Sequence, residues 1–212
     1  MTSKEVEDLY NLLKGFIFSA IKMKSLPRQG WIRVGIPLSD VESIADHSYN
    51  TAMLSLMLVD IHNILYPDRP LKSDLVMRLA IIHDLPECMY QDLDHQVHIL
   101  LGQDLYNEVK RKILVSASEE LLQLILNEDV KKQWKEMFDD MANKNSEEAR
   151  FVNYVDKLEL LIQALSYENL GYSGNLFDPF WQTSKEFLKN CDFEVINDLI
   201  PLIESERKSN NA

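Results

Sequence analysis

The chain has 212 residues, of which 22 are Lys or Arg and 34 are Asp or Glu, so its formal net charge is −12. An acidic chain lacks the basic footprint that binds nucleic acid phosphates or anionic lipid surfaces, so we expect no nucleic acid polymer and no membrane as a partner. Hydrophobic residues make up 46% and charged residues 26% of the chain, which are ordinary values for a folded protein and exclude wholesale disorder.

The residue types that punctuate β-structure are scarce. The chain has six glycines and seven prolines, and it contains neither Asn-Gly nor Asp-Gly. Sustained alternation of apolar and polar residues is also missing, so we predict an all-α fold. Cys88 and Cys191 are far apart and form no CxxC, which argues against a disulfide framework or a zinc ribbon. Without a signal-peptide pattern or an apolar run of about 18 residues, we expect a cytoplasmic protein.

The first predicted helix covers about residues 4–24, where apolar residues from Leu9 to Ile21 recur at steps of three and four and form one face. It ends before Leu26-Pro27, because a residue that precedes proline avoids the helical conformation. Residues 27–41 contain two prolines and two glycines and are predicted to form an ordered loop.

The remaining elements are also helical in pattern. Ser43 and Asp46 form a capping-box pair that starts a helix running to about residue 65. Further helices are predicted after Ser73, over 104–127 and 129–142, and from 146 to about 170, with a last helical region ending near 203. No internal repeat or linker divides the chain. We therefore predict a single domain over residues 1–212, with its core at about 10–190 and a frayed polar tail at 204–212.

The chemically informative pair is His83-Asp84, which lies inside an apolar run. Adjacent residues of a helix point about 100° apart, so one ion binds both side chains only from the wedge between them. Other helices must complete the shell, and His47 and Asp156 have the right residue types. Two imidazoles and two carboxylates suit Mn²⁺, Co²⁺, Fe²⁺, Zn²⁺ or Mg²⁺. The alternative is a hydrogen-bonded His-Asp pair in a core.

The order His47, His83-Asp84, Asp156 resembles the H…HD…D signature of the HD-domain metal-dependent phosphohydrolases. Within that superfamily, the strings at 27–31, 41–48, 81–87 and 155–164 are similar to the motifs of the single-domain 5′-deoxynucleotidases, and the resemblance covers about residues 10–190. It implies an all-α HD-domain helical bundle, one divalent metal ion, and a homodimer. The implied reaction converts deoxynucleoside 5′-monophosphates to deoxynucleosides and phosphate.

The resemblance also implies roles for individual residues. The four signature residues would hold the metal ion, which acts as a Lewis acid on the phosphoryl group and lowers the pKa of a bound water. Glu87 lies four residues after His83 and three after Asp84, so we expect it on the same helix face, where a carboxyl group suits a general acid or base. Arg28 would act in catalysis as a phosphate clamp, because a guanidinium binds phosphate bidentately. The alternatives are an exposed helix glutamate and a solvated loop arginine.

Several other positions leave two readings open. Trp31 either packs against the sugar or base of the substrate or anchors its loop. The resemblance implies that Asp92 binds the sugar 3′-hydroxyl, and the alternative is a helix-terminal cap. His95 and His98 either form a second metal site or lie at the pocket rim. Pro86 either kinks the helix that carries His83 or marks its end.

Three classes of function are compatible with this pattern. The favoured class is a deoxynucleoside monophosphate phosphohydrolase. The second is an HD phosphohydrolase that acts on a triphosphate, a cyclic nucleotide or an alarmone. Longer nucleotides require more basic groups or a second metal ion, and the sequence clearly shows neither. The third is a non-catalytic HD scaffold, which the complete ligand set together with Glu87 disfavours.

Overall fold

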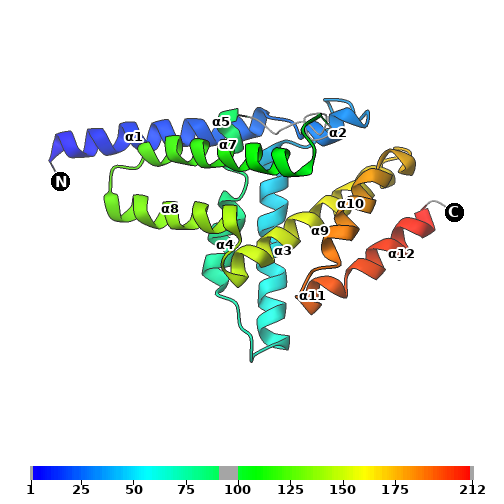
Figure 1. Cartoon of the computed structure of the whole chain (residues 1–212). Coiled ribbons are helices and arrows are strands. Elements are labelled where there is room, and N and C mark those ends of the chain that lie inside the picture. Colours follow the sequence, from blue (N-terminus) through cyan, green and yellow to red (C-terminus); the bar gives the residue numbers. More distant parts are fainter. Residues whose placement is uncertain (1, 91–99, 211–212) are drawn as a thin grey trace.

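The computed structural model of the protein describes residues 2–90 and 100–210, and these form helices, turns and loops without a β-strand (Figure 1). The all-α prediction is confirmed. Two 3-10 turns, Lys22–Ser25 and Gly174–Leu176, supplement the α-helices. The helices are α1 (Ser3–Ile21), α2 (Gln29–Arg33), α3 (Ile44–Leu65), α4 (Ser73–Ile82), α5 (Glu87–Tyr90), α7 (Gln103–Gln123), α8 (Glu128–Asn143), α9 (Glu147–Asn169), α10 (Asp178–Leu188), α11 (Glu194–Asn197) and α12 (Ile200–Asn210).

The centre of the fold is the crossing of α3 and α9, and α4 packs against both (Figure 1). The two central helices start at capping serines: Ser43 forms the expected capping box with Asp46, and Ser146 accepts a hydrogen bond from the backbone of Ala149. Both helices bury residues along most of their length, from Ile44 to His62 on α3 and from Glu148 to Glu168 on α9. The crossing therefore supplies a rigid frame on which polar side chains can be placed.

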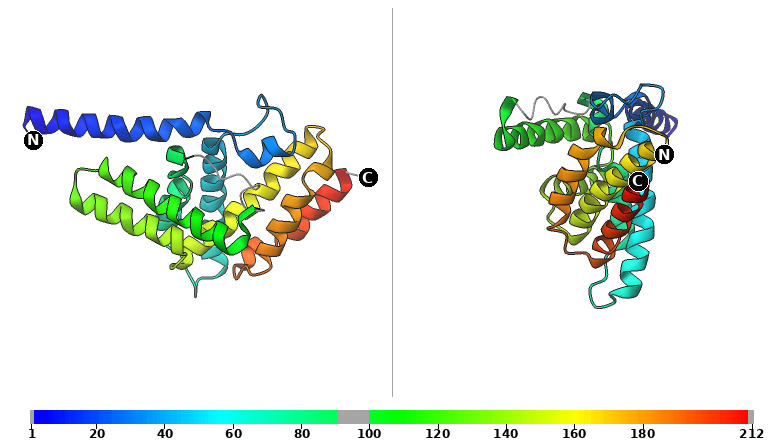
Figure 2. Two further views of the ribbon diagram at one scale, coloured as in Figure 1. Left: turned by 45° about the horizontal axis from the view of Figure 1, so that its top comes forward. Right: turned by 90° about the vertical axis from the view of Figure 1, so that its right-hand side faces the viewer.

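Helix α1 is amphipathic as predicted, but its apolar face is largely uncovered. Phe16 packs edge-on against Trp134 of α8, with ring centroids 5.2 Å apart. Leu9, Leu13 and Ile17 are 40%, 55% and 51% exposed. Figure 2 shows the N-terminal end of α1 extending beyond the other helices. The periodicity of this segment correctly predicted a helix, but residues 2–90 and 100–210 do not supply a surface that buries the stripe.

The His83-Asp84 segment is a turn rather than part of a helix. Helix α4 ends at Ile82, and α5 begins at Glu87. Pro86 therefore marks the end of the helix and does not kink it, because proline disfavours a helical residue before it. The backbone N–H of Glu87 donates to the carbonyl of Asp84 at 2.9 Å. The expectation that Glu87 shares a helix face with His83 is thus wrong, although the tight turn keeps the two residues together.

Two features of the later helices bear on the site and the tail. Helix α8 ends at Asn143, and the residue that caps it, Lys144, has a left-handed backbone with φ 54°. Helix α12 continues to Asn210, and Arg207 bonds to Glu168 and Asp178, both at 2.8 Å. The prediction of a frayed tail therefore does not hold over 204–210, because this arginine fastens the end of the chain to α9 and α10.

None of the described helices is long and apolar enough to cross a membrane.

Candidate active site

Four side chains from three parts of the chain meet where α3, α9 and the turn after α4 converge. The Nε2 atom of His47 lies 3.3 Å from Nε2 of His83, 3.5 Å from Oδ2 of Asp84 and 3.2 Å from Oδ1 of Asp156. The Nε2 atom of His83 lies 3.3 Å from the same Asp84 oxygen. The structure thus brings together all four residues that the sequence pointed to as metal ligands.

Both imidazoles are oriented by a second partner. The Nδ1 atom of His47 lies 2.6 Å from Oε2 of Glu159, which is one helical turn beyond Asp156 on α9. The Nδ1 atom of His83 lies 2.8 Å from the carbonyl oxygen of Ala80. With Nδ1 of each ring directed at these oxygens, Nε2 is the nitrogen that faces the cluster and that would ligate a cation. Such outer partners fix the tautomer and the ring orientation of metal-binding histidines. Glu159 was not among the site residues predicted from the sequence.

The electrostatics of the cluster follow from burial and proximity. Burial favours the neutral form of Asp84, but His83, His47 and Arg28 outweigh burial and hold the pKa of Asp84 well below its usual value. Burial and Arg28 lower the pKa of His47, whereas hydrogen bonds to Asp156 and Glu159 raise it to about 10. The cluster is therefore a set of ionised carboxylates that attracts positive charge.

The donor set fits a divalent cation. Ligand atoms of His47, His83 and Asp156 all lie within 4.8 Å of one another, and Asp84 contacts both imidazoles. Two imidazole nitrogens with carboxylate oxygens suit first-row divalent ions and Mg²⁺. A dication bound between the two carboxylates would offset their charge and replace the proton on His47. The residues present can thus hold a metal ion.

A second buried group, Glu42 with His47 and Glu159, supports the cluster from behind. Oε1 of Glu42 accepts a hydrogen bond from Nε1 of Trp31 at 2.7 Å, and Glu159 is occupied by His47. Burial and the charge of Glu159 raise the pKa of Glu42 to about 7. Because these carboxyl groups already bind protein donors, we interpret the group as a support for His47 rather than as a second ion site.

Arg28 is held beside the cluster by its loop. Its Nη1 atom lies 3.2 Å from Oδ2 of Asp84, and its backbone N–H donates to the carbonyl of Glu42 at 3.0 Å. The backbone N–H of Glu42 in turn donates to the hydroxyl of Tyr167 on α9 at 2.9 Å. The loop that carries Arg28 is therefore fastened to the same helix that supplies Asp156.

Trp31 does not reach the pocket. It is 1% exposed, and its ring packs against Tyr167, Phe177 and Phe180 with centroid separations of 5.3, 5.9 and 4.5 Å. No ring face is left for a sugar or base, because aromatic neighbours from α9 and α10 cover it. The structure thus supports the loop-anchor reading of Trp31, in which its bond to Glu42 helps to hold Arg28 in place.

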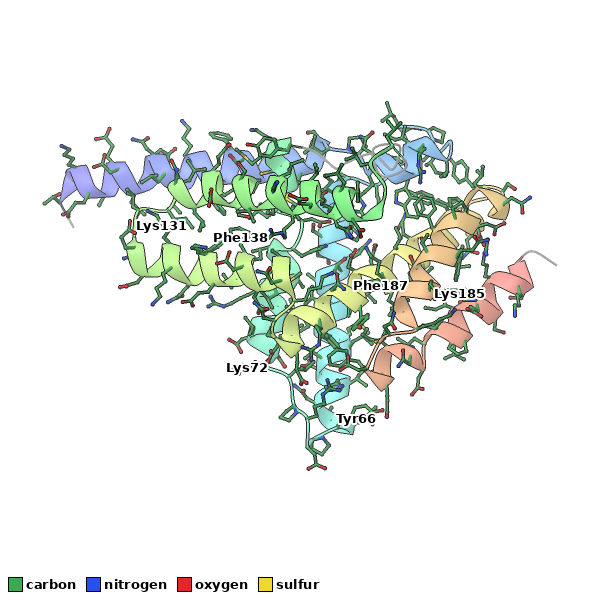
Figure 3. The ribbon with its side chains drawn as sticks, viewed as in Figure 1. Tyr66, Lys72, Lys131, Phe138, Lys185 and Phe187 are labelled. Carbon is green, nitrogen blue, oxygen red and sulfur yellow. The ribbon has the colours of Figure 1, made fainter. Side chains whose placement is uncertain are left out.

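A pocket of about 580 Å³ opens over the cluster. This volume lies within the usual range for small-molecule sites. Glu87 lines this pocket together with His83, Asp84 and Asp156, and its side chain is buried. The opposite side of the pocket is formed by α7, α8 and α10. Phe138 of α8 lies between the ribbons of α8 and α7, and Phe187 of α10 lies beside α9 (Figure 3). These helices were not associated with the site by the sequence analysis.

The pocket also contains cations that the sequence did not reveal. They come from α7, α8 and α9 and are Lys110, Arg111, Lys135, Lys144 and Lys157. Asp92, His95 and His98 lie outside the described residues, so their predicted roles stay predictions. The sequence does not reveal this set, because basic residues at 110–111, 135, 144 and 157 share no regular spacing and become neighbours only in the folded chain.

A sequence model of the HD domain family matches residues 20–192. The chain belongs to the HD domain family. This confirms the resemblance drawn from His47, His83-Asp84 and Asp156, and it agrees with the convergence of these residues in space.

Characterised relatives and solved structures extend this finding. The chain is 32% identical over 203 residues to 5′-deoxynucleotidase HDDC2 of Bos taurus, covering 95% of this chain and 88% of the relative. It is 28% identical over 153 residues to 5′-deoxynucleotidase hdd1 of Schizosaccharomyces pombe, covering 72% and 71% of the two chains. A conserved hypothetical protein of Pyrococcus furiosus, 30% identical, superposes with a TM-score of 0.67 over 92% of this chain and 98% of its own.

Proposed function

We propose that the protein is a metal-dependent phosphomonoesterase that converts deoxynucleoside 5′-monophosphates to deoxynucleosides and phosphate. The observation that carries the proposal is the convergence of His47, His83, Asp84 and Asp156 at the base of a ligand-sized pocket. Relatives whose sequences match this chain over 95% and 72% of its length are named 5′-deoxynucleotidases. The nucleotide monophosphate is therefore the substrate class to test first.

The residues around the cluster have complementary tasks in this reaction. A divalent cation held by the four ligands supplies Lewis-acid polarisation of the phosphoryl group. Arg28, beside Asp84, directs its guanidinium to the phosphate oxygens and offsets the charge that develops on them. Glu87 is a buried carboxyl at the pocket wall, where it can hold a proton or release one to the leaving oxygen.

The test is release of phosphate from a panel of mono- and triphosphates, in ribo and deoxy forms, with added Mn²⁺, Co²⁺ or Mg²⁺. We expect release from deoxynucleoside monophosphates by the wild type and loss of that release in Asp84→Ala and Glu87→Ala. Asp68→Ala, in an exposed loop away from the site, is the matched control and should retain activity. An absence of phosphate release from every nucleotide would contradict the enzymatic proposal, and release from triphosphates alone would favour another HD phosphohydrolase.

We also propose that the protein forms a homodimer through the uncovered apolar face of α1. Val6, Leu13 and Ile17 are 53%, 55% and 51% exposed on this helix, and a second copy would remove them from water. Light scattering on a size-exclusion column should show a dimer for the wild type and a smaller species for Ile17→Asp. Asn11→Asp, an exposed change on the same helix, is the control. A monomeric wild type at all concentrations would contradict the proposal.

We propose further that residues 1–212 act as one domain in the cytoplasm. Helix α12 packs on α9, the same helix that supplies Asp156, so the end of the chain is tied to the site. Cys88 and Cys191 are both free and buried, which suits a reducing compartment. Limited proteolysis should leave a single resistant core, and cell fractionation should recover the protein with cytosolic markers. Two independently stable fragments or a membrane-associated pool would contradict these proposals.

A further inference from the structure

The charge of the pocket differs from the charge of the chain. The whole chain has 22 Lys and Arg residues against 34 Asp and Glu residues. The pocket is lined by five cations against five carboxylates, Asp84, Glu87, Glu119, Asp139 and Asp156. Two of these carboxylates are metal ligands, which a bound dication would neutralise. The pocket with its ion in place is thus a locally cationic cavity in an acidic protein, and local charge governs the binding of a small anion.

Three of the cations come together next to Asp156. Lys110 is on α7, Lys144 ends α8 and Lys157 is on α9, and all three line the pocket. The Lys157 ammonium lies 2.8 Å from Oδ2 of Asp156. Burial lowers the pKa of Lys144, the charge of Lys157 lowers it further, Asp156 raises it, and Lys110 lowers it again. Like charges from three separate helices are thus held close enough to repel one another.

Lys144 is the least compensated of the three. Within the parts of the chain that the structure describes, no carboxylate oxygen lies within 4 Å of its ammonium, and its contact is with the ring of Phe187, 5.8 Å from the centroid. Lys135, by comparison, lies 2.6 Å from Asp139 and has its charge offset. A cation that faces a pocket beside two others gains most from an anionic ligand, because such a ligand replaces repulsion with attraction.

We propose that Lys110, Lys144 and Lys157 form a second anion subsite, which binds a phosphoryl group that the nucleotide carries in addition to the one at the metal cluster. This inference rests on the proposed function, since the first phosphate is placed at His47, His83, Asp84 and Asp156. The ligand class is a nucleotide with two phosphate groups. The second group is either the β-phosphate of a 5′-diphosphate or a separate 3′-phosphate.

The test measures binding rather than turnover. Calorimetric titration of metal-loaded Glu87→Ala, the variant expected to release no phosphate, with dAMP, dADP and deoxyadenosine 3′,5′-bisphosphate gives dissociation constants without hydrolysis, and the subsite variants are made in the same background. We expect one of the two-phosphate nucleotides to bind about tenfold more tightly than dAMP, as a charge-assisted contact allows. The nucleotide that shows the gain identifies whether the second group is a 5′ β-phosphate or a 3′-phosphate.

Two variants and a control assign the gain to the subsite. Lys144→Gln and Lys110→Gln should reduce it to within twofold of dAMP, whereas Lys132→Gln, an exposed change on α8 outside the pocket, should retain it. The proposal is overturned if neither two-phosphate nucleotide binds more tightly than dAMP, or if the gain persists in both pocket variants. Phosphate release from dAMP by the metal-loaded wild type is measured in parallel. Its absence alongside a Lys144-dependent gain would refute the hydrolase proposal and leave the subsite standing.

Discussion

The base and the outer wall of the pocket are built in opposite ways. The base consists of His47, His83, Asp84 and Asp156, which contact one another at 3.2–3.5 Å and are backed by Glu159. The outer wall carries lysines on α7 and α9 and at the C-terminal cap of α8. The base is fixed by mutual contacts before any ligand arrives, whereas the wall brings like charges together and leaves Lys144 without a carboxylate oxygen within 4 Å in the described parts of the chain. Changes at the base should therefore affect catalysis, and changes at the wall should affect affinity.

The largest expected effect comes from breaking the base. Asp156→Asn removes one carboxylate ligand while keeping the side-chain shape, so we expect about a thousandfold loss of phosphate release and a lower metal content. The measurements are steady-state rates and metal analysis of the purified protein. Asp68→Asn in the exposed loop should change neither quantity. Full activity in Asp156→Asn would remove this residue from the ligand set.

The next effect tests the support behind the base. Glu159→Gln weakens the bond that orients His47, and loss of such an outer partner lowers metal affinity or activity about 10- to 100-fold. Titration with metal should show the weaker binding, and excess metal should restore much of the activity. A variant whose activity falls without any change in metal affinity would show that Glu159 acts in another way.

A smaller effect is expected where the base meets the phosphate. Arg28→Lys retains the charge beside Asp84 but loses the planar fork. We expect KM for the monophosphate to rise about tenfold with metal content unchanged, and the measurement is a substrate titration at saturating metal. An equal KM in the two proteins would mean that Arg28 acts as a point charge, as a lysine of the wall does.

The smallest effect concerns the stability of the network behind His47. Because the pKa of Glu42 is raised to about 7 from an ordinary 4.5, the folded protein keeps a proton there that the unfolded chain releases between these values. The free energy of unfolding therefore falls as pH rises from 4.5 through 7. Glu42→Gln removes this titration and still accepts the bond from Trp31, so its loss of stability between pH 5 and pH 8 should be smaller than that of the wild type. Urea unfolding at both pH values measures this, and identical pH dependence in the two proteins would contradict it.

The same contrast explains what the sequence could predict. The four candidate ligands, which the structure brings together, were identifiable because His-Asp in an apolar run and two further candidates on predicted helix faces form an ordered pattern that resembles the HD signature. Glu159 could in principle have been predicted from the sequence, because it lies one helical turn from Asp156. The lysines of the pocket wall could not be predicted. Lys110, Lys144 and Lys157 share no spacing and become neighbours only through the packing of α7 and α8 against α9.

Two local expectations failed for physical reasons that the sequence contained only in part. Glu87 was placed on the helix of His83, but the proline between them ended that helix. Trp31 was given a substrate contact as one reading, but aromatic residues more than 130 positions away cover it. Long-range packing decides such cases, and a single chain read in order does not display it.

The left-handed backbone of Lys144 has a consequence for engineering the protein. Glycine adopts a φ of 54° freely, whereas a lysine at that angle is strained by about 1 kcal/mol. Lys144→Gly should therefore make the protein slightly more resistant to heat while removing a charge that faces the pocket. Engineering guided by melting temperature alone would select this change, which raises thermal stability and lowers affinity for an anionic ligand.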